Sequence, residues 1–142
     1  MKLFGGTSGD SDTITSLSGQ EMLDVLTGMG FSPTLGTDSG GDPKISFQIE
    51  GMRCSVFFYG VKEGRGTSLQ FSIGFTDSGV PLDKVNEWNR TKRFLKVYKD
   101  TDGGVVGQMD VDLDGGVHRA YLEECVKRWR AVFFTFIRFL TA

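Results

Sequence analysis

Three aspartates in one short segment are the residues with the clearest potential for chemistry. Asp110, Asp112 and Asp114 stand at alternate positions and are followed by glycine, so the segment matches the opening places of a calcium-binding EF-hand loop. The last place of such a loop needs a glutamate that binds calcium through both oxygens, but Tyr121 stands there. The residues that enter the segment also alternate as in a strand. We therefore expect Asp110 and Asp112 on the solvent face of a strand, Asp114 in the following turn, and no bound metal.

A catalytic or zinc site finds little support in the sequence. Acyl-transfer chemistry needs a nucleophile beside a histidine, but the only histidine is His118, at the expected start of the last helix, where it is explained by capping of free amides. Cys54 and Cys125 lie in apolar patterns without C-x-x-C spacing, which is typical of buried small side chains. The glycine-rich stretch 60–66 lacks the phosphate-loop pattern and is expected to be a hairpin connection. The sequence thus predicts neither an enzyme nor a cofactor.

A basic and aromatic run ends the expected central helix. It extends from Trp88 to Phe94 and contains Arg90, Lys92 and Arg93. Such a cluster can bind an acidic partner or stack on nucleic-acid bases, although cations at a helix C-terminus also fit the helix dipole alone. The chain has 16 basic and 18 acidic residues, for a net charge of -2, and this balance attracts neither nucleic acid nor an anionic membrane. We expect no nucleic-acid or membrane partner.

The chain has the length and composition of one globular domain. Its 142 residues are near the commonest domain size, and 39% of them are hydrophobic and 24% charged. Residues 1–17 are rich in glycine, serine, threonine and aspartate, so we expect a flexible N-terminal tail followed by a single domain over residues 18–142. The sequence shows neither a signal peptide nor a membrane span, which indicates a cytoplasmic protein; a periplasmic protein whose leader was removed would look the same.

Apolar periodicity predicts the elements that position these residues. A capping box at Ser18 and Glu21 starts a helix over residues 19–28. Alternating strands follow over 34–35, 44–50, 52–59 and 69–75, then a helix that begins near Pro81, strands over 94–99 and 105–113, and a last amphipathic helix over 118–140. The order is α, three or four strands, α, two strands, α. This pattern predicts an α+β fold, with an antiparallel sheet packed against helices.

Some apolar side chains are left over once each element has filled its inward face. Phe57 and Tyr59 lie opposite the buried side of their strand, and Phe134 and Ile137 flank the main stripe of the last helix. Surplus apolar surface of this kind marks interaction sites. We expect these side chains to form a homodimer interface or a partner-binding site, to which the basic run described above contributes. The alternative is that a second layer, such as the first helix, covers them.

Three segments of the chain resemble the YbjN family of bacterial proteins, which are regarded as sensory transduction regulators. The segments are Phe58-Tyr59-Gly60 with Ser68-Leu69-Gln70-Phe71, then Val85-Asn86-Glu87-Trp88-Asn89-Arg90-Thr91-Lys92-Arg93-Phe94, then Met109-Asp110-Val111-Asp112-Leu113-Asp114-Gly115-Gly116-Val117. The resemblance covers residues 18–140 and implies a fold similar to type III secretion chaperones, α-β-β-β-α-β-β-α. It implies no enzyme activity and no known cofactor. Such chaperones commonly dimerise and hold extended polypeptide segments, so it also implies a polypeptide partner.

The resemblance bears on the compartment as well. Some family members that look exported carry a cysteine pair in the loop after the F-Y-G motif, whereas Val61 and Arg65 stand near those places here. An oxidised periplasmic form is therefore disfavoured. As a whole, the sequence predicts a non-catalytic regulatory or protein-binding module. The alternative is a small-molecule or calcium-sensing domain, and a hydrolytic enzyme comes third.

Overall fold

The computed structural model describes residues 13–76 and 79–142. Within them the helices are α1 (Gly19–Gly28), α2 (Leu82–Thr91) and α3 (Arg119–Thr141). The strands are β1 (Leu17–Ser18), β2 (Thr34–Thr37), β3 (Pro43–Ile49), β4 (Met52–Tyr59), β5 (Arg65–Gly66), β6 (Ser68–Phe75), β7 (Lys96–Lys99) and β8 (Val105–Asp112). Strands β1 and β5 form a small pair, and the other six form one antiparallel sheet in the order β2-β3-β4-β6-β8-β7. The predicted α+β fold is confirmed.

The large sheet has one apolar face because side chains alternate along its strands. Val56 pairs with Phe71, which pairs with Met109, so a row of buried side chains crosses the centre of the sheet. One position further along, Ser55 and Ser72 are paired in the same way on the opposite face. The alternation read from the sequence therefore separates a buried face from a polar one.

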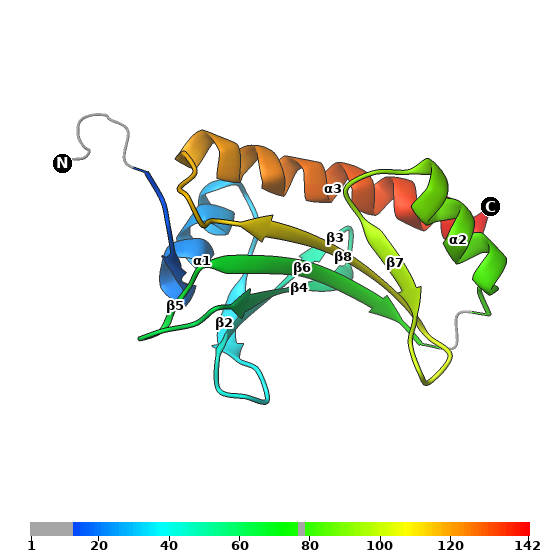
Figure 1. Cartoon of the computed structure of the whole chain (residues 1–142), viewed down its shortest axis with the longest axis horizontal. Helices are drawn as coiled ribbons and strands as arrows, with labels where there is room; N and C mark the ends of the chain where they lie inside the picture. Colours follow the sequence, from blue (N-terminus) through cyan, green and yellow to red (C-terminus); the bar gives the residue numbers. More distant parts are fainter. Residues whose placement is uncertain (1–12, 77–78) are drawn as a thin grey trace.

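Helix α3 lies lengthwise across the apolar face of the sheet (Figure 1). Its buried residues recur every three or four positions, and they are Leu122, Cys125, Val126, Trp129, Phe133 and Phe136. The rings of Trp129 and Phe71 pack with their centroids 5.5 Å apart. Since α3 and the sheet bury each other's apolar sides, they form the two main layers of the domain. The predicted packing of the sheet against helices is confirmed for this helix.

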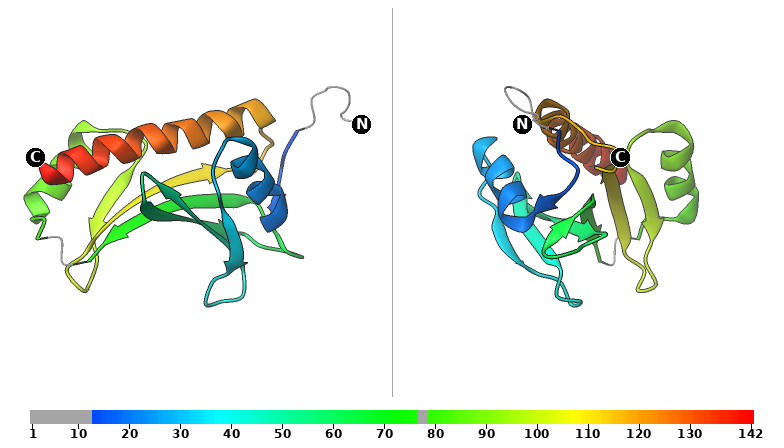
Figure 2. Two further views of the ribbon diagram at one scale, coloured as in Figure 1. Left: turned by 180° about the vertical axis from the view of Figure 1, so that it is seen from behind. Right: turned by 60° about the vertical axis from the view of Figure 1, so that its left-hand side comes forward.

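The two shorter helices stand at opposite edges of the sheet, α1 beside β2 and β3 and α2 beside β7 (Figure 2). The capping box of α1 is confirmed, because the Ser18 hydroxyl accepts from the Glu21 amide at 3.1 Å and the Glu21 carboxylate accepts from the Ser18 amide at 2.9 Å. Burial acts to raise the pKa of Glu21, but the Ser18 amide and the Arg65 guanidinium outweigh it and lower that pKa. The buried side of α1 joins the same core as α3.

The sheets decide one open number and correct one prediction. Four strands of the large sheet precede α2, which is the larger of the two numbers read from the sequence and one more than in the order that the resemblance implies, because residues 34–37 pair along β3 as a full strand. The stretch 60–66 is not a plain hairpin, since Arg65 and Gly66 pair with Ser18 and Leu17. This pairing also brings the Arg65 guanidinium to 2.9 Å from the Glu21 carboxylate. A two-residue strand pair of this kind depends on a contact distant in sequence.

The paired part of the chain begins before residue 17. Ile14 and Val117 exchange backbone hydrogen bonds of 2.7 Å and 2.9 Å, so the predicted flexible tail does not reach the first helix. The remainder of that tail, residues 1–12, lies outside the described residues. Among the described helices, none is long and apolar enough to cross a membrane.

Candidate functional site

The three aspartates do not converge on a common point. Asp110 and Asp112 project from β8 and are exposed, as predicted, and Asp114 follows the strand. The Asp110 carboxylate accepts from the Gln70 side-chain amide at 2.9 Å, and the Asp112 carboxylate accepts from the Asp114 backbone amide at 3.0 Å. Within residues 13–76 and 79–142, no group of three or more histidine, cysteine, aspartate or glutamate residues could hold a metal ion.

The histidine and the cysteines are placed for structure rather than for chemistry. His118 is the N-cap residue of α3, as expected, but its side chain makes no capping hydrogen bond, so only the position was predicted correctly. Cys54 and Cys125 are free and buried, as predicted. Burial raises the pKa of the Cys54 thiol to about 12, although Trp129 acts to lower it. A thiol held in its neutral form at physiological pH is a poor nucleophile.

The face of the large sheet opposite α3 carries the leftover aromatics of β4. No described helix lies over this face (Figure 1). Phe57 is half-buried, with the Lys44 ammonium 5.3 Å from its ring centroid, and Tyr59 is 51% exposed. The Tyr59 hydroxyl donates to the side-chain carbonyl of Gln70 at 3.3 Å. The predicted outward direction of Phe57 and Tyr59 agrees with this placement, and the first helix does not cover them.

Phe134 and Ile137 lie on a different surface. Both are half-buried on α3 and pack against the core, and the Phe134 ring contacts that of Phe133 at a centroid distance of 5.9 Å. Because α3 covers the apolar face of the sheet, these residues and the Phe57–Tyr59 pair are on opposite sides of it. The structure does not join the four residues into one patch.

The basic run is brought together with a residue of α3 that the sequence did not single out. Arg90, Lys92 and Arg93 are exposed at and after the end of α2, and the next residue, Phe94, is 52% exposed. The guanidiniums of Arg93 and Arg128 lie 4.8 Å and 4.6 Å from the centroid of the Phe94 ring. In the described part of the chain, neither guanidinium forms an ion pair. The result is an exposed ring between two cations that lack carboxylate partners there.

Strand β8 continues beyond the end of its neighbour β7. Pairing between the two strands ends at Lys96 and Gln108, whereas β8 runs on to Asp112. In the same register Phe94 would face Asp110, but Phe94 has a backbone φ of 77°, which a bulky residue rarely adopts. The chain therefore turns away from β8 at this point, and the last four residues of β8 have no paired strand on that side.

A groove of about 320 Å³ lies between this unpaired part of β8 and α3. Phe94 and Arg128 contribute to its walls, together with Tyr121, which is 48% exposed. The pKa of the Tyr121 phenol is raised, chiefly by its interaction with the Cys125 thiol. Sequence reasoning missed Tyr121 and Arg128 because their spacing on α3 looks like that of any polar flank. Only the fold shows that they face Phe94 and the edge of β8.

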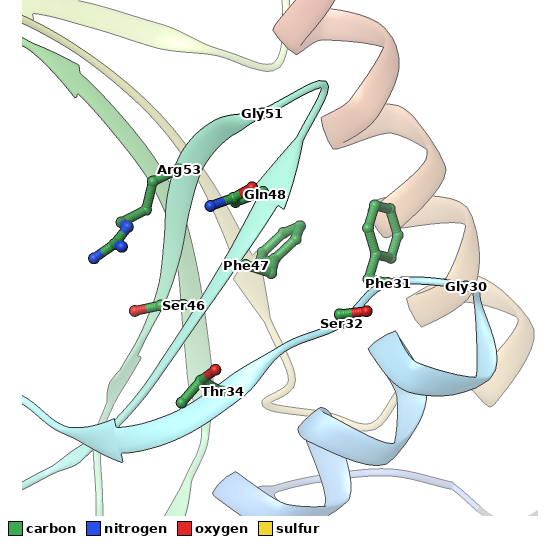
Figure 3. A pocket seen from close by; sticks show the side chains of 9 residues that line it. All are labelled: Gly30, Phe31, Ser32, Thr34, Ser46, Phe47, Gln48, Gly51 and Arg53. Atoms are coloured by element: carbon green, nitrogen blue, oxygen red, sulfur yellow. The ribbon is translucent and has the colours of Figure 1, made fainter.

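A second hollow, of about 550 Å³, lies at the edge of β3 beyond the end of β2 (Figure 3). The rings of Phe31 and Phe47 meet edge to face there, 5.2 Å apart. The side chains of Ser46 and Arg53 point to the other side of β3 from these rings (Figure 3). The polar and the aromatic groups of this hollow therefore do not surround one ligand position.

These features define a class of protein: a small α+β domain with one covered and one uncovered sheet face, and without converging catalytic groups among the described residues. The chain belongs to the YbjN family, since the model of that family, described as "Putative bacterial sensory transduction regulator", matches residues 18–142. No curated protein and no solved structure matches the chain. The likeness to type III secretion chaperones stays a prediction.

Proposed function

We propose that the protein is a non-catalytic regulatory module that acts by binding another polypeptide, and that it forms a homodimer. The observation that carries the proposal is the uncovered face of the six-stranded sheet, with exposed Tyr59 and half-buried Phe57 opposite a face buried under α3. Aromatic side chains on an uncovered face are characteristic of surfaces that bury a partner. Membership of a family described as a sensory transduction regulator supports a regulatory role.

The proposed absence of catalysis rests on the chemistry of the available groups. The single histidine, His118, stands at the N-cap position of α3, and the Cys54 thiol is held neutral by burial. Neither is placed as part of a nucleophile and base pair. A screen of general hydrolase substrates should give no turnover above that of a heat-denatured sample, and saturable turnover would contradict the proposal.

A small-molecule sensor is the less well supported alternative, because the polar and aromatic groups of the hollow beside Phe31 lie on different sides of β3 (Figure 3). A ligand that raises the melting temperature of the wild type but not of Arg53→Ala would contradict this ranking. A calcium sensor is not supported, because the Asp110 and Asp112 carboxylates accept hydrogen bonds from Gln70 and from the Asp114 amide and do not face a common point. Calcium chloride should therefore leave the melting temperature unchanged, in the wild type and in Asp112→Ala alike.

Light scattering and partner capture test the main proposal together. Phe57→Ser and Tyr59→Ser should each lower the dimer mass or reduce capture of a polypeptide from native extract. Leu82→Ser is the matched control, because Leu82 is 69% exposed on α2, away from the uncovered face. Phe134→Ser and Ile137→Ser test the second surface on α3 in the same way. A monomer mass for the wild type, with capture unchanged in all four variants, would contradict the proposal.

A further inference from the structure

We infer that the unpaired edge of β8, residues 109–112, is a docking site for an extended segment of another polypeptide whose side chains facing α3 include carboxylates. This inference deepens the proposed polypeptide-binding function and rests on it. The segment would add to the sheet as a strand in line with β7. Two observations carry the inference: the direction of the backbone groups of β8, and the charges on either side of its edge.

The direction of the backbone groups follows from hydrogen bonds at both ends of β8. The amide of Leu113 donates to the carbonyl of Thr67 at 2.9 Å, so odd-numbered residues point toward β6. The amide of Asp100 donates to the carbonyl of Gly104 at 2.8 Å, so even-numbered residues point toward β7. The amides and carbonyls of Asp110 and Asp112 therefore point to the side where, in the described chain, no strand continues the pairing.

This edge is open because of Phe94 and because nothing in the described chain replaces β7 there. The φ of 77° at Phe94 directs the backbone away from the position opposite Asp110, so the Phe94 backbone does not pair with β8. The Phe94 ring lines the groove beside the edge. A strained backbone conformation costs free energy and persists only where the surrounding structure enforces it. Such conformations are characteristic of functional sites. An added strand would pair with the four backbone groups that the diverted chain leaves free.

The charged side chains beside residues 109–112 differ in sign between the two sides of the edge, while Lys96 lies at the end of β7, next to Gln108 on the uncovered face. On the side of α3, the guanidiniums of Arg93 and Arg128 flank Phe94 without ion-pair partners in the described chain. On the uncovered face, Asp110 and Asp112 are exposed. Side chains of an added strand alternate between these sides. The complementary segment therefore carries aspartate or glutamate toward α3, where arginine can bind carboxylates with two hydrogen bonds, and lysine or arginine toward the uncovered face.

A polypeptide fits this site better than a nucleic acid does. The edge offers both amide donors and carbonyl acceptors in a strand register, which a phosphate backbone cannot match. The carboxylates of Asp110 and Asp112 also repel a polyanion along the same edge. Two other edges differ from this one: Asn89 of α2 binds the outer edge of β7, and β2 carries no charged residue.

Fluorescence anisotropy of a labelled peptide with the full chain tests the inference. The probe is a capped peptide of about eight residues in which glutamate and valine on one side alternate with lysine and threonine on the other. It should bind, and a peptide with glutamate and lysine exchanged should bind at least about tenfold more weakly. Methylation of alternate backbone nitrogens should abolish binding in only one of the two possible registers, because only one side of an added strand pairs with β8.

Variants of the protein separate backbone pairing from charge. Asp110→Pro removes an amide that points to the free edge, without removing a bond to β6, whereas Asp110→Ala keeps that amide and removes only the carboxylate. The alanine variant should weaken binding, and the proline variant should abolish it. Arg128→Glu should weaken binding at least about tenfold, and Arg138→Glu, on the same helix outside the groove, should not. Melting curves show which variants fold. If Asp110→Pro does not fold, the methylated peptides test the same pairing.

The outcomes distinguish the inference from the proposed function. Peptide binding could be unaffected by Arg128→Glu and by peptide methylation but lost in Phe57→Ser. This result would overturn the edge site and would still support the proposed function of polypeptide binding. An absence of binding by either peptide would also overturn the edge site, while capture that depends on Phe57 would still support the function. Competition by a single-stranded oligonucleotide that depends on Arg128 would show a polyanion site instead. Loss of the dimer in Arg128→Glu, without peptide binding, would assign the edge to a second copy of the chain.

Discussion

The side-chain amide of Asn89 in α2 binds both backbone groups of Val97 in β7. Its nitrogen donates to the Val97 carbonyl at 2.8 Å, and its oxygen accepts from the Val97 amide at 3.1 Å. The indole of Trp88 donates to the carbonyl of Leu95 at 2.8 Å on the same side. One helix thus satisfies the outer edge of β7 with side chains, as a neighbouring strand would do.

We predict that Asn89→Ala lowers the free energy of unfolding by about 1–2 kcal/mol, since two hydrogen bonds are lost and two backbone groups are left without partners. The uncovered edge should also cause association that increases with protein concentration. Urea titration and light scattering measure the two effects. Asn86→Ala is the control, because Asn86 is exposed on the same helix. Equal effects of the two substitutions would show that the edge does not depend on Asn89.

Trp129 is predicted to be the most costly residue to truncate among those of α3. Its side chain is fully buried against Phe71 and Phe133, so Trp129→Ala should cost about 3–5 kcal/mol, a large part of the stability of a domain. Trp129→Phe keeps an aromatic ring in the core and leaves a smaller cavity than alanine does, so it should cost less, about 2 kcal/mol. Chemical denaturation compares the variants. An alanine variant that unfolds at the wild-type midpoint would contradict the prediction.

Phe94 offers a comparison of backbone strain with side-chain contact. Glycine adopts a φ of 77° without strain, whereas alanine does not. Phe94→Gly and Phe94→Ala both remove the ring between Arg93 and Arg128, so their difference reports the backbone alone. We expect the glycine variant to be more stable than the alanine variant by about 1 kcal/mol in denaturant titrations. The reverse order would mean that residue 94 does not hold this conformation in solution.

Cys54 is predicted to be unreactive in the folded protein. Its thiol has a pKa of about 12 against an ordinary value of 9.0, because burial disfavours the thiolate. Iodoacetamide at pH 8 should label it only when denaturant unfolds the chain. The folded state holds this proton more tightly than the unfolded state does, so the thiol's contribution to stability is present below pH 9 and is lost as the pH rises toward 12. The alkaline loss of stability should be smaller in Cys54→Ala than in the wild type, and an equal loss would contradict the assignment.

The elements that were predicted well carry their signals locally. The helix over residues 19–28 has a capping box at its start and glycine at its end, and both of its bounds are as predicted. The strand Met52–Tyr59 alternates through its whole length and is also as predicted. In contrast, the pairing of Leu17–Ser18 with Arg65–Gly66 depends on segments far apart in the chain. Local periodicity contains no information about such a contact.

The candidate site was predicted in part for the same reason. Composition and alternation indicate Phe57 and Tyr59 as outward-facing, and they identify the basic run that extends from Trp88 to Phe94. The meeting of that run with Arg128 could not be predicted, because it requires knowing where the last helix lies on the sheet. The conformation of Phe94 was equally hidden, since no sequence rule places a phenylalanine at a positive φ.

The position of α3 in the chain has a consequence for biosynthesis. Every strand of the large sheet precedes α3, and α3 supplies six of the buried side chains that cover the sheet. As the chain grows from its N-terminus, the sheet can pair before its apolar face has a cover. Nascent chains that stop short of residue 119 would therefore expose Phe71 and its buried neighbours, and would be clients for the chaperones that meet polypeptides at the ribosome.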